Sequence, residues 1–268
     1  MRPHFRLIAD QPCVVLFFAL LAAAVVLIGC GSQSAHRMDA ALPPAIPAPQ
    51  PVLLYTGEGT SSSDVAALQT ILGNLSIGYI TADAAKLSAM SEAQLGGYKL
   101  IIVPGGNSIT IGQSLTGSTS VAIRGAVQQY GVHYLGVCAG AFFGGSSVYN
   151  GVDLTSGVAF NFYADEFLGI HVEAVQISFP NTRPLNMYWQ DGPQLSGWGQ
   201  VVAKFPDGTP AIVEGQSGNG FVILTGIHPE APQAWLASPA FTSSVAVDQA
   251  YAGTVIKAAL DGTPLPHF

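Results

Sequence analysis

An apolar stretch that ends in a glycine-flanked cysteine constrains the fold of this chain more than any other feature. Residues 134–137 have the composition of a buried strand, and Cys138 follows with Gly136 two residues before it and Gly140 two after. This G-x-C-x-G pattern predicts a sharp turn from strand to helix, in which the cysteine takes a strained conformation and its neighbours are small. The turn lifts the sulfur out of the sheet and points the following N–H groups at whatever the sulfur attacks. The pattern favours a nucleophile, and an inert buried thiol is the alternative.

The N-terminal segment has the features of a targeting signal. Two arginines precede an apolar run from Cys13 to Ile28, which is short for a membrane span, and Gly29-Cys30 closes it. This resembles the bacterial lipoprotein signal, in which the cysteine is lipidated and becomes the new N-terminus. We therefore expect residues 1–29 to be a signal peptide and Cys30 to be lipidated; an uncleaved membrane anchor is the alternative. Both interpretations predict an extracytoplasmic protein attached to a bacterial membrane.

These expectations leave one cysteine in the mature domain. Cys13 leaves with the signal, Cys30 carries lipid, and Cys138 remains without a disulfide partner, as a candidate reactive thiol. Residues 30–51 are rich in proline and alanine and are expected to form an extended tether that builds no core. The remaining residues, 52–268, are expected to form one domain.

The first half of that domain alternates short apolar runs with helical patterns. Apolar strands are expected at 52–55, 77–81, 100–103 and 134–137, with helices between them around 62–75 and 121–130. Such alternation predicts an α/β fold with a doubly wound, mostly parallel sheet and helices on both faces. In such sheets ligands bind at the carboxyl ends of the strands.

The second half reads as short strands followed by one helix. Strands are expected at 158–163, 170–179, 185–189 and 200–205, and the apolar runs 211–214 and 221–224 flank a glycine-rich segment, which predicts a hairpin with a longer loop over 215–220. A final helix is expected from about Ser243 to Leu260, with Gly262 as its stop.

Composition excludes one class of partner. The net charge is −7, and no cluster of basic residues occurs beyond the N-terminus, which argues against nucleic acid. No C-x-x-C or H-x-x-x-H pattern occurs, so we expect no metal and no cofactor; a metal site made by Cys138, His228 and Glu230 is the less favoured alternative.

A histidine motif late in the chain supplies a partner for the thiol. His228-Pro229-Glu230 follows the last expected strand, and two residues apart in an extended segment point the same way. A thiol is a poor nucleophile until an imidazole stabilises or creates the thiolate, and the imidazole needs an acceptor to orient it. We therefore predict that Cys138, His228 and Glu230 form a catalytic set, with the N–H groups of Gly106 and Ala139 holding the oxyanion.

Together these motifs resemble the class I glutamine amidotransferase fold, and more closely the N-terminal domain of biotin–protein ligases and its stand-alone bacterial relatives. The resemblance is carried, in order, by Val52–Ser61, Val103–Gly106, Gly136–Gly144, Tyr188–Gly192 and Gly226–Glu230. It implies a fold and a triad-like site, but not ligase activity, because nothing in the chain resembles the ligase catalytic domain. In related hydrolases an acidic residue hydrogen-bonds the thiol, and the resemblance implies that Glu58 could be such an auxiliary acid. The alternative is that Glu58 is an ordinary residue of a solvated loop.

The resulting functional expectation is a lipid-anchored, amidotransferase-like hydrolase. Cys138 would attack an amide or related acyl bond of a small molecule or peptide, and water would resolve the thioester. The alternatives are an inactive module that binds a small molecule or peptide in the same cleft, and a redox-sensing thiol. The aromatic residues Tyr188, Trp189, Phe142 and Tyr163 either line this cleft or belong to the core.

Overall fold

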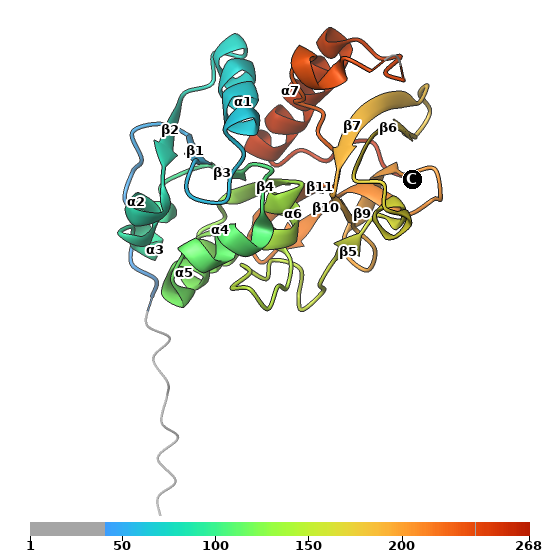
Figure 1. Ribbon diagram of the computed structural model, residues 1–268. Coiled ribbons are helices and arrows are strands. Elements are labelled where there is room, and N and C mark those ends of the chain that lie inside the picture. Colours follow the sequence, from blue (N-terminus) through green and yellow to red (C-terminus); the bar gives the residue numbers. More distant parts are fainter. Residues whose placement is uncertain (1–40, 239) are drawn as a thin grey trace, which may run out of the picture. The chain divides into compact units, whose positions relative to one another are not determined.

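A computed structural model describes residues 41–238 and 240–268 and divides the chain into two units, Met1–Ala41 and Leu42–Phe268. The second unit is an α/β domain (Figure 1). Its first half contains β1 (Val52–Tyr55), α1 (Ser62–Asn74), β2 (Tyr79–Ala82), α2 (Ala84–Ser88), α3 (Glu92–Leu95), β3 (Leu100–Val103), α4 (Ser108–Ser114), α5 (Gly117–Gln128), β4 (His133–Val137) and α6 (Ala139–Gly144).

The second half adds mostly antiparallel strands and one long helix. Its elements are β5 (Asn161–Phe162), the short 3-10 helix η1 (Ala164–Leu168), β6 (Val172–Ile177), β7 (Leu185–Gln190), β8 (Pro193–Gln194), β9 (Gln200–Lys204), β10 (Pro210–Ser217), β11 (Gly220–Thr225), the 3-10 helix η2 (Gln233–Leu236) and α7 (Val245–Asp261). The main sheet has the order β2-β1-β3-β4-β11-β10-β9, parallel from β2 to β11 and antiparallel at β10 and β9. The predicted mostly parallel α/β sheet is therefore confirmed.

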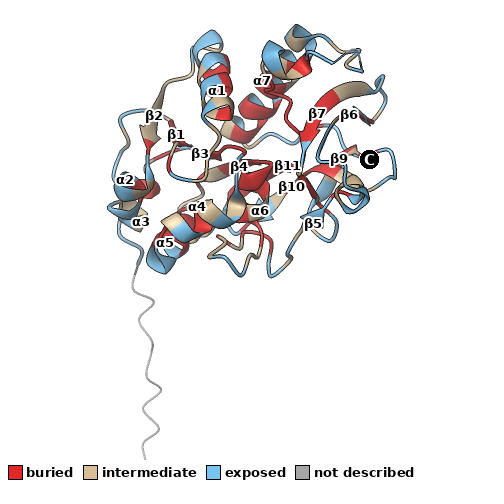
Figure 2. Cartoon of the chain, in the orientation of Figure 1, coloured by how far each residue is buried: buried red, intermediate tan, exposed pale blue. Residues whose placement is uncertain are grey.

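Alternate residues of the central strands face two separate cores. Leu54, Ile102 and Leu135 point into the core that α1 and α7 cover. Leu53 and Ile101, one position away, point into the core that α2 to α6 cover. Figure 2 shows the resulting buried layer between the two groups of helices. Because side chains alternate along a strand, a strand buried on both faces is apolar throughout, as β1 and β3 are.

The hairpin of β10 and β11 is longer than the sequence predicted. The two strands stay paired as far as Ser217 and Gly220, so only Gly218 and Asn219 form the turn. The predicted loop over 215–220 is therefore wrong. Gly218 has a φ of 60°, which suits a two-residue turn between twisted strands and leaves the other glycine-rich positions free to join the ladder.

The end of the expected tether lies against the domain. The hydroxyl of Tyr130 donates to the carbonyl oxygen of Pro43 at 2.9 Å, and the N–H of Ile46 donates to the carbonyl oxygen of Ala93 at 2.9 Å. Ala48 contacts the core under α2 to α6. In this respect the structure differs from a tether that is extended throughout. The signal peptide and Cys30 lie outside the described residues, and no helix within 41–238 and 240–268 is long and apolar enough to cross a bilayer.

A buried carboxyl group in α7 predicts a pH-dependent loss of stability. Asp248 is buried, its Oδ1 has no hydrogen-bond partner among the described residues, and burial raises its pKa to about 7. The folded state then favours the protonated form of Asp248. The stability that this protonated carboxyl contributes is fully present below about pH 4 and is lost as pH rises toward 7. We expect the free energy of unfolding of the wild type, relative to Asp248→Asn, to fall by about 4 kcal/mol between pH 4 and pH 8. Urea unfolding of both proteins measures this, and parallel pH curves would contradict it.

Candidate active site

The turn after β4 holds Cys138 in a strained conformation. Its φ is 48° and its ψ is −103°, values that a non-glycine residue rarely adopts. Its N–H donates to the carbonyl oxygen of Thr225 at 2.7 Å, which ties the turn to the end of β11. A Cβ on Gly136 would overlap the carbonyl oxygen of Gly140, and a Cβ on Gly140 would overlap that of Val103. The local geometry is that of a nucleophile elbow, and the glycines are needed because the backbones approach so closely.

This close approach yields a prediction with a matched control. Gly140→Ala is expected to destabilise the protein by about 2 to 3 kcal/mol, because the carbonyl of Val103 must move to admit the methyl group. Gly73→Ala, in α1, places its methyl group in open space and is expected to be neutral or to stabilise by up to about 1 kcal/mol. Denaturant unfolding of the two variants compares them, and equal losses would contradict the role given to Gly140.

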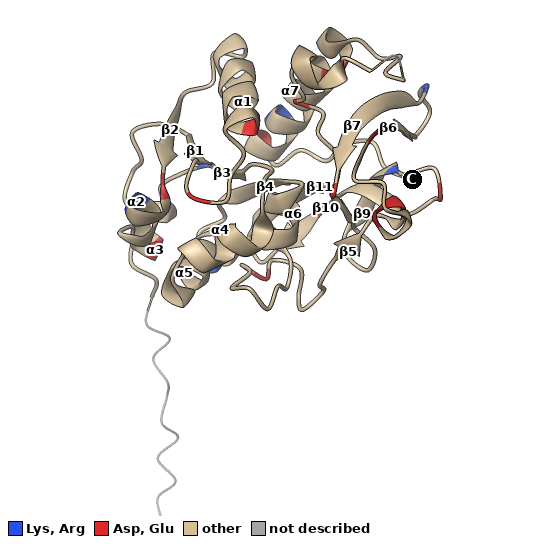
Figure 3. Cartoon of the chain, in the orientation of Figure 1, with Lys and Arg blue, Asp and Glu red and all other residues tan. Residues whose placement is uncertain are grey.

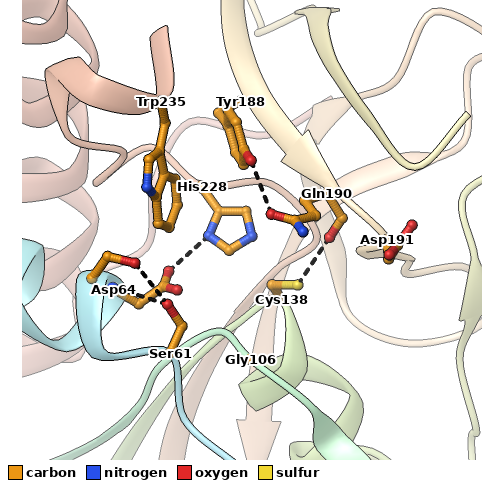
Figure 4. Close-up of a pocket in the computed structure, with 10 residues that line it drawn as sticks. Ser61, Asp64, Gly106, Cys138, Tyr188, Gln190, Asp191, His228 and Trp235 are labelled. Atoms are coloured by element: carbon orange, nitrogen blue, oxygen red, sulfur yellow. Dashed lines mark hydrogen bonds and ion pairs between the residues drawn. The ribbon is translucent and has the colours of Figure 1, made fainter.

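His228 reaches the thiol from the loop after β11. Its N–H donates to the carbonyl oxygen of Tyr188 at 2.9 Å, so β7 holds the backbone of the motif in place. The imidazole lies between aromatic rings, with ring-centre distances of 5.7 Å to Tyr188 and 5.6 Å to Trp235. Figure 4 shows one ring nitrogen toward the carboxylate of Asp64 and the other on the side of Cys138. The thiol itself donates to the carbonyl oxygen of Gln190 at 3.4 Å.

Two carboxyl groups hold the same nitrogen of His228. Nδ1 lies 2.9 Å from Oδ1 of Asp64 and 2.9 Å from Oε1 of Glu230. The sequence predicted the second contact and missed the first. An ionised carboxylate only accepts hydrogen bonds, so Nδ1 carries the hydrogen and Nε2 is left for the thiol. Asp64 comes from the first turn of α1, just beyond the carboxyl end of β1, where Ser61 caps the helix.

The two carboxyl groups differ in charge. Burial opposes ionisation of Asp64, but the hydrogen bond and charge of His228 lower its pKa to about 2. Burial, together with the nearby Asp64, raises the pKa of Glu230 to about 7 despite the opposing charge of His228. Burial alone would lower the pKa of His228, but the charges of Cys138 and Glu230 and the hydrogen bond that His228 donates to Asp64 raise it well above its ordinary value. At neutral pH Asp64 is therefore the ionised partner, and Glu230 is partly protonated.

The residues predicted to hold the oxyanion share a cavity with Cys138. Gly106 and Ala139 line the same cavity as Cys138, and Ala139 begins α6, so its N–H has no partner within the helix. Gly106 has a φ of +140°, and a Cβ there would overlap the carbonyl oxygen of Gly59. The two residues predicted to supply the oxyanion donors therefore line the same cavity as the thiol. Glu58 is exposed and lines neither cavity at Cys138, whereas Asp64 lines the larger one.

The thiol opens into a pocket of about 380 Å³, a volume suited to a small molecule. Tyr188 and Trp235 form its aromatic wall, and Gln190 and Asp191 part of its rim. Of the aromatic candidates from the sequence, Tyr188 lines this pocket, while Trp189 and Tyr163 are buried in the core. Trp235 was not predicted, because nothing in the sequence around it distinguishes a pocket wall from a core residue.

The same side chains include a potential ligand set for a metal. Asp64, His228 and Glu230 each offer one atom, and these atoms lie within 4.8 Å of one another. In the structure these atoms hydrogen-bond to each other through Nδ1. A cation would have to replace the hydrogen on Nδ1, so the arrangement fits an oriented imidazole better than a metal site.

The chain is similar to known proteins in part of its sequence and in its fold. The model of the biotin–protein ligase N-terminal family matches residues 50–159, which include Asp64, Gly106 and Cys138 and end before His228. The resemblance to this family is thus confirmed for that part of the chain. No curated protein sequence matches the chain significantly.

Two solved structures are similar to this chain, and the first of them supports the same fold. A glutamine amidotransferase from Methylobacillus flagellatus has a TM-score of 0.53 at 12% identity, covering 82% of this chain and 97% of its own. A glutamine amidotransferase from Thermotoga maritima has a TM-score of 0.47 at 12% identity, covering 79% of this chain and 89% of its own. At such low identity the likeness concerns the fold alone.

Proposed function

We propose that the protein is a cysteine-dependent hydrolase of an amide or related acyl bond. The observation that carries the proposal is the order of groups at one pocket: a thiol on a strained elbow, an imidazole beside it, and two carboxyl groups on the far ring nitrogen. This order is what nucleophilic catalysis requires.

The proposal assigns a group to each step of the reaction. The proton of Cys138 first passes to Nε2 of His228, whose raised pKa favours the imidazolium. The sulfur then attacks the acyl carbon, and the N–H groups of Gly106 and Ala139 stabilise the oxyanion. His228 then gives the proton to the leaving nitrogen, which departs as an amine and leaves a thioester. Water attacks the thioester, giving its proton to His228, and the carboxylic acid leaves as the thiol is restored.

Intact-protein mass spectrometry tests this proposal. On mixing with an activated ester such as p-nitrophenyl acetate, the wild type is expected to gain the mass of one acetyl group, which disappears as the ester is consumed. Cys138→Ala is expected to gain none. If the wild type gains no acetyl group, or Cys138→Ala gains it equally, the proposal fails and the inactive binding module becomes the better account.

We further propose that a lipid on Cys30 anchors the protein to a bacterial membrane on its extracytoplasmic side. The support is the sequence pattern alone, in which an apolar run ends in Gly29-Cys30. Metabolic labelling with a radioactive fatty acid tests it. The wild type is expected to be labelled and to sediment with membranes, Cys30→Ser is expected to lose the label, and an unlabelled wild type would overturn it.

A further inference from the structure

A second cavity meets the main pocket at the nucleophile. Its volume is about 190 Å³, and Gly106, Cys138 and Asp191 line both cavities. Ala139, the other oxyanion donor, lines only the smaller one. A substrate whose reacting carbon sits on the sulfur therefore has space on two sides.

Three apolar side chains, those of Ile109, Phe142 and Phe162, line the smaller cavity beside the polar Asn107 and Ser108. Phe162 and Ile109 are 40% and 39% exposed, and Phe142 packs edge-to-face on Phe162 with 5.0 Å between ring centres. An apolar ligand group here would remove this surface from water. A cavity of about 150 Å³ holds a benzene ring, so 190 Å³ is enough for a group of one-ring size.

The position of His228 decides which half of a substrate lies where. His228 lines the larger pocket and not the smaller one. Because the imidazole has to reach the leaving nitrogen, the amine half belongs in the larger pocket. The acyl half then extends past the oxyanion donors into the smaller cavity.

The charges near the site disfavour an anionic acyl group. Figure 3 shows how sparse lysine and arginine are in the domain, and none of the described ones lines either cavity. These residues are Lys86, Lys99, Arg124, Arg183, Lys204 and Lys257. Asp191 lines both cavities and so lies where they meet. Nδ1 of His171 lies 2.9 Å from Oδ1 of Asp191, but His171 lines neither cavity. A carboxylate on the acyl half would meet a like charge and no cation.

We propose that the cavity of Phe142, Phe162 and Ile109 is the acyl-specificity site, and that it selects an uncharged, apolar acyl group of about one-ring size. The inference rests on the proposed hydrolase function, whose substrate class it specifies. Glutamine and other acyl donors with a charged far end are accordingly poor substrates.

Activated esters with one leaving group test the preference. We expect kcat/KM for p-nitrophenyl phenylacetate to exceed that for p-nitrophenyl acetate by about tenfold to a hundredfold, after division by their uncatalysed rates. The mono-p-nitrophenyl ester of succinic acid is expected to fall below the acetate. Phe162→Ala is expected to lower the phenylacetyl preference at least about fivefold, while Phe167→Ala, at an exposed phenylalanine outside both cavities, leaves it unchanged.

A binding measurement separates failure of this inference from failure of the hydrolase proposal. Calorimetry with Cys138→Ala, which cannot turn over substrate, is expected to show tighter binding of phenylacetamide than of acetamide or glutamine. Ester turnover without acyl preference overturns the inference and leaves the hydrolase standing. Preferential binding of phenylacetamide without any turnover by the wild type supports the cavity assignment and overturns the hydrolase. Equal binding of the three amides overturns the cavity assignment.

Discussion

Replacing His228 by glutamine is expected to lower kcat for ester hydrolysis by about 10⁴-fold or more. In catalytic sets that act as a unit, loss of the base costs about as much as loss of the nucleophile. Here His228 is the group placed to take the proton of Cys138, and two carboxyl groups hold it in position. Steady-state release of p-nitrophenol from an activated ester measures the loss.

The His228 result needs a control for folding. The variant's circular dichroism spectrum and urea midpoint are expected to show that the domain still forms, since the sheet and its two cores do not depend on the imidazole. A folded variant that retains more than about a tenth of the wild-type rate would contradict a role as the base.

Replacing Asp64 by asparagine is expected to lower kcat by about 10³- to 10⁴-fold. An amide in place of the carboxylate permits the wrong tautomer of His228 and removes the charge that stabilises the imidazolium, a change that costs a serine protease about 10⁴-fold. The geometry permits this effect because Oδ1 of Asp64 lies 2.9 Å from Nδ1. The measurement is kcat at pH 7 with the same ester.

Glu230→Gln is the matched control for Asp64. Burial and the neighbouring Asp64 raise the pKa of Glu230 to about 7, so glutamine imitates a form that the wild type already populates at neutral pH. We expect a loss of less than about tenfold at pH 6, which grows as pH rises above 7 and the wild-type carboxyl ionises. If Glu230→Gln is the more damaging change at pH 6, the assignment of the two acids is reversed.

Much of the fold was predictable because its signals are local. β1, β3 and β4 are short, mostly apolar runs, as expected of strands that are buried on both faces of a sheet, and Pro104 directly follows β3. The helices α2, α3 and α4 were missed because they have four to seven residues, too few for a helical period. Their only signals were the caps Asp83, Ser91 and Asn107, each of which accepts a hydrogen bond from an N–H in its helix's first turn.

The strands of the second half were located less well. The run 158–163 contains only the two-residue strand β5, and the run 170–179 shortens to β6. Both segments belong to two-stranded sheets outside the main one, so few pairing partners extend them. Residue composition indicated extended backbone there, and the pairing that sets strand length is not a local property.

Asp64 marks the limit of sequence reasoning at the site. Its serine-rich surroundings indicated a helix cap, and Ser61 does cap α1. The contact with His228 spans 164 positions and follows only once β1 and β11 are known to lie in the same sheet. The sole signal was an acidic residue just beyond the carboxyl end of a parallel strand, where ligands of such sheets gather.

The rate at which iodoacetamide alkylates Cys138 at pH 6.5 tests the coupling of thiol and imidazole most directly, because it requires no knowledge of the substrate. Only the thiolate reacts, and an isolated thiol is almost entirely protonated at this pH. We predict that the wild type reacts at least about tenfold faster than His228→Gln, as expected where an imidazole assists formation of the thiolate. Equal rates for the two folded proteins would contradict the coupling and with it the proposed catalytic set.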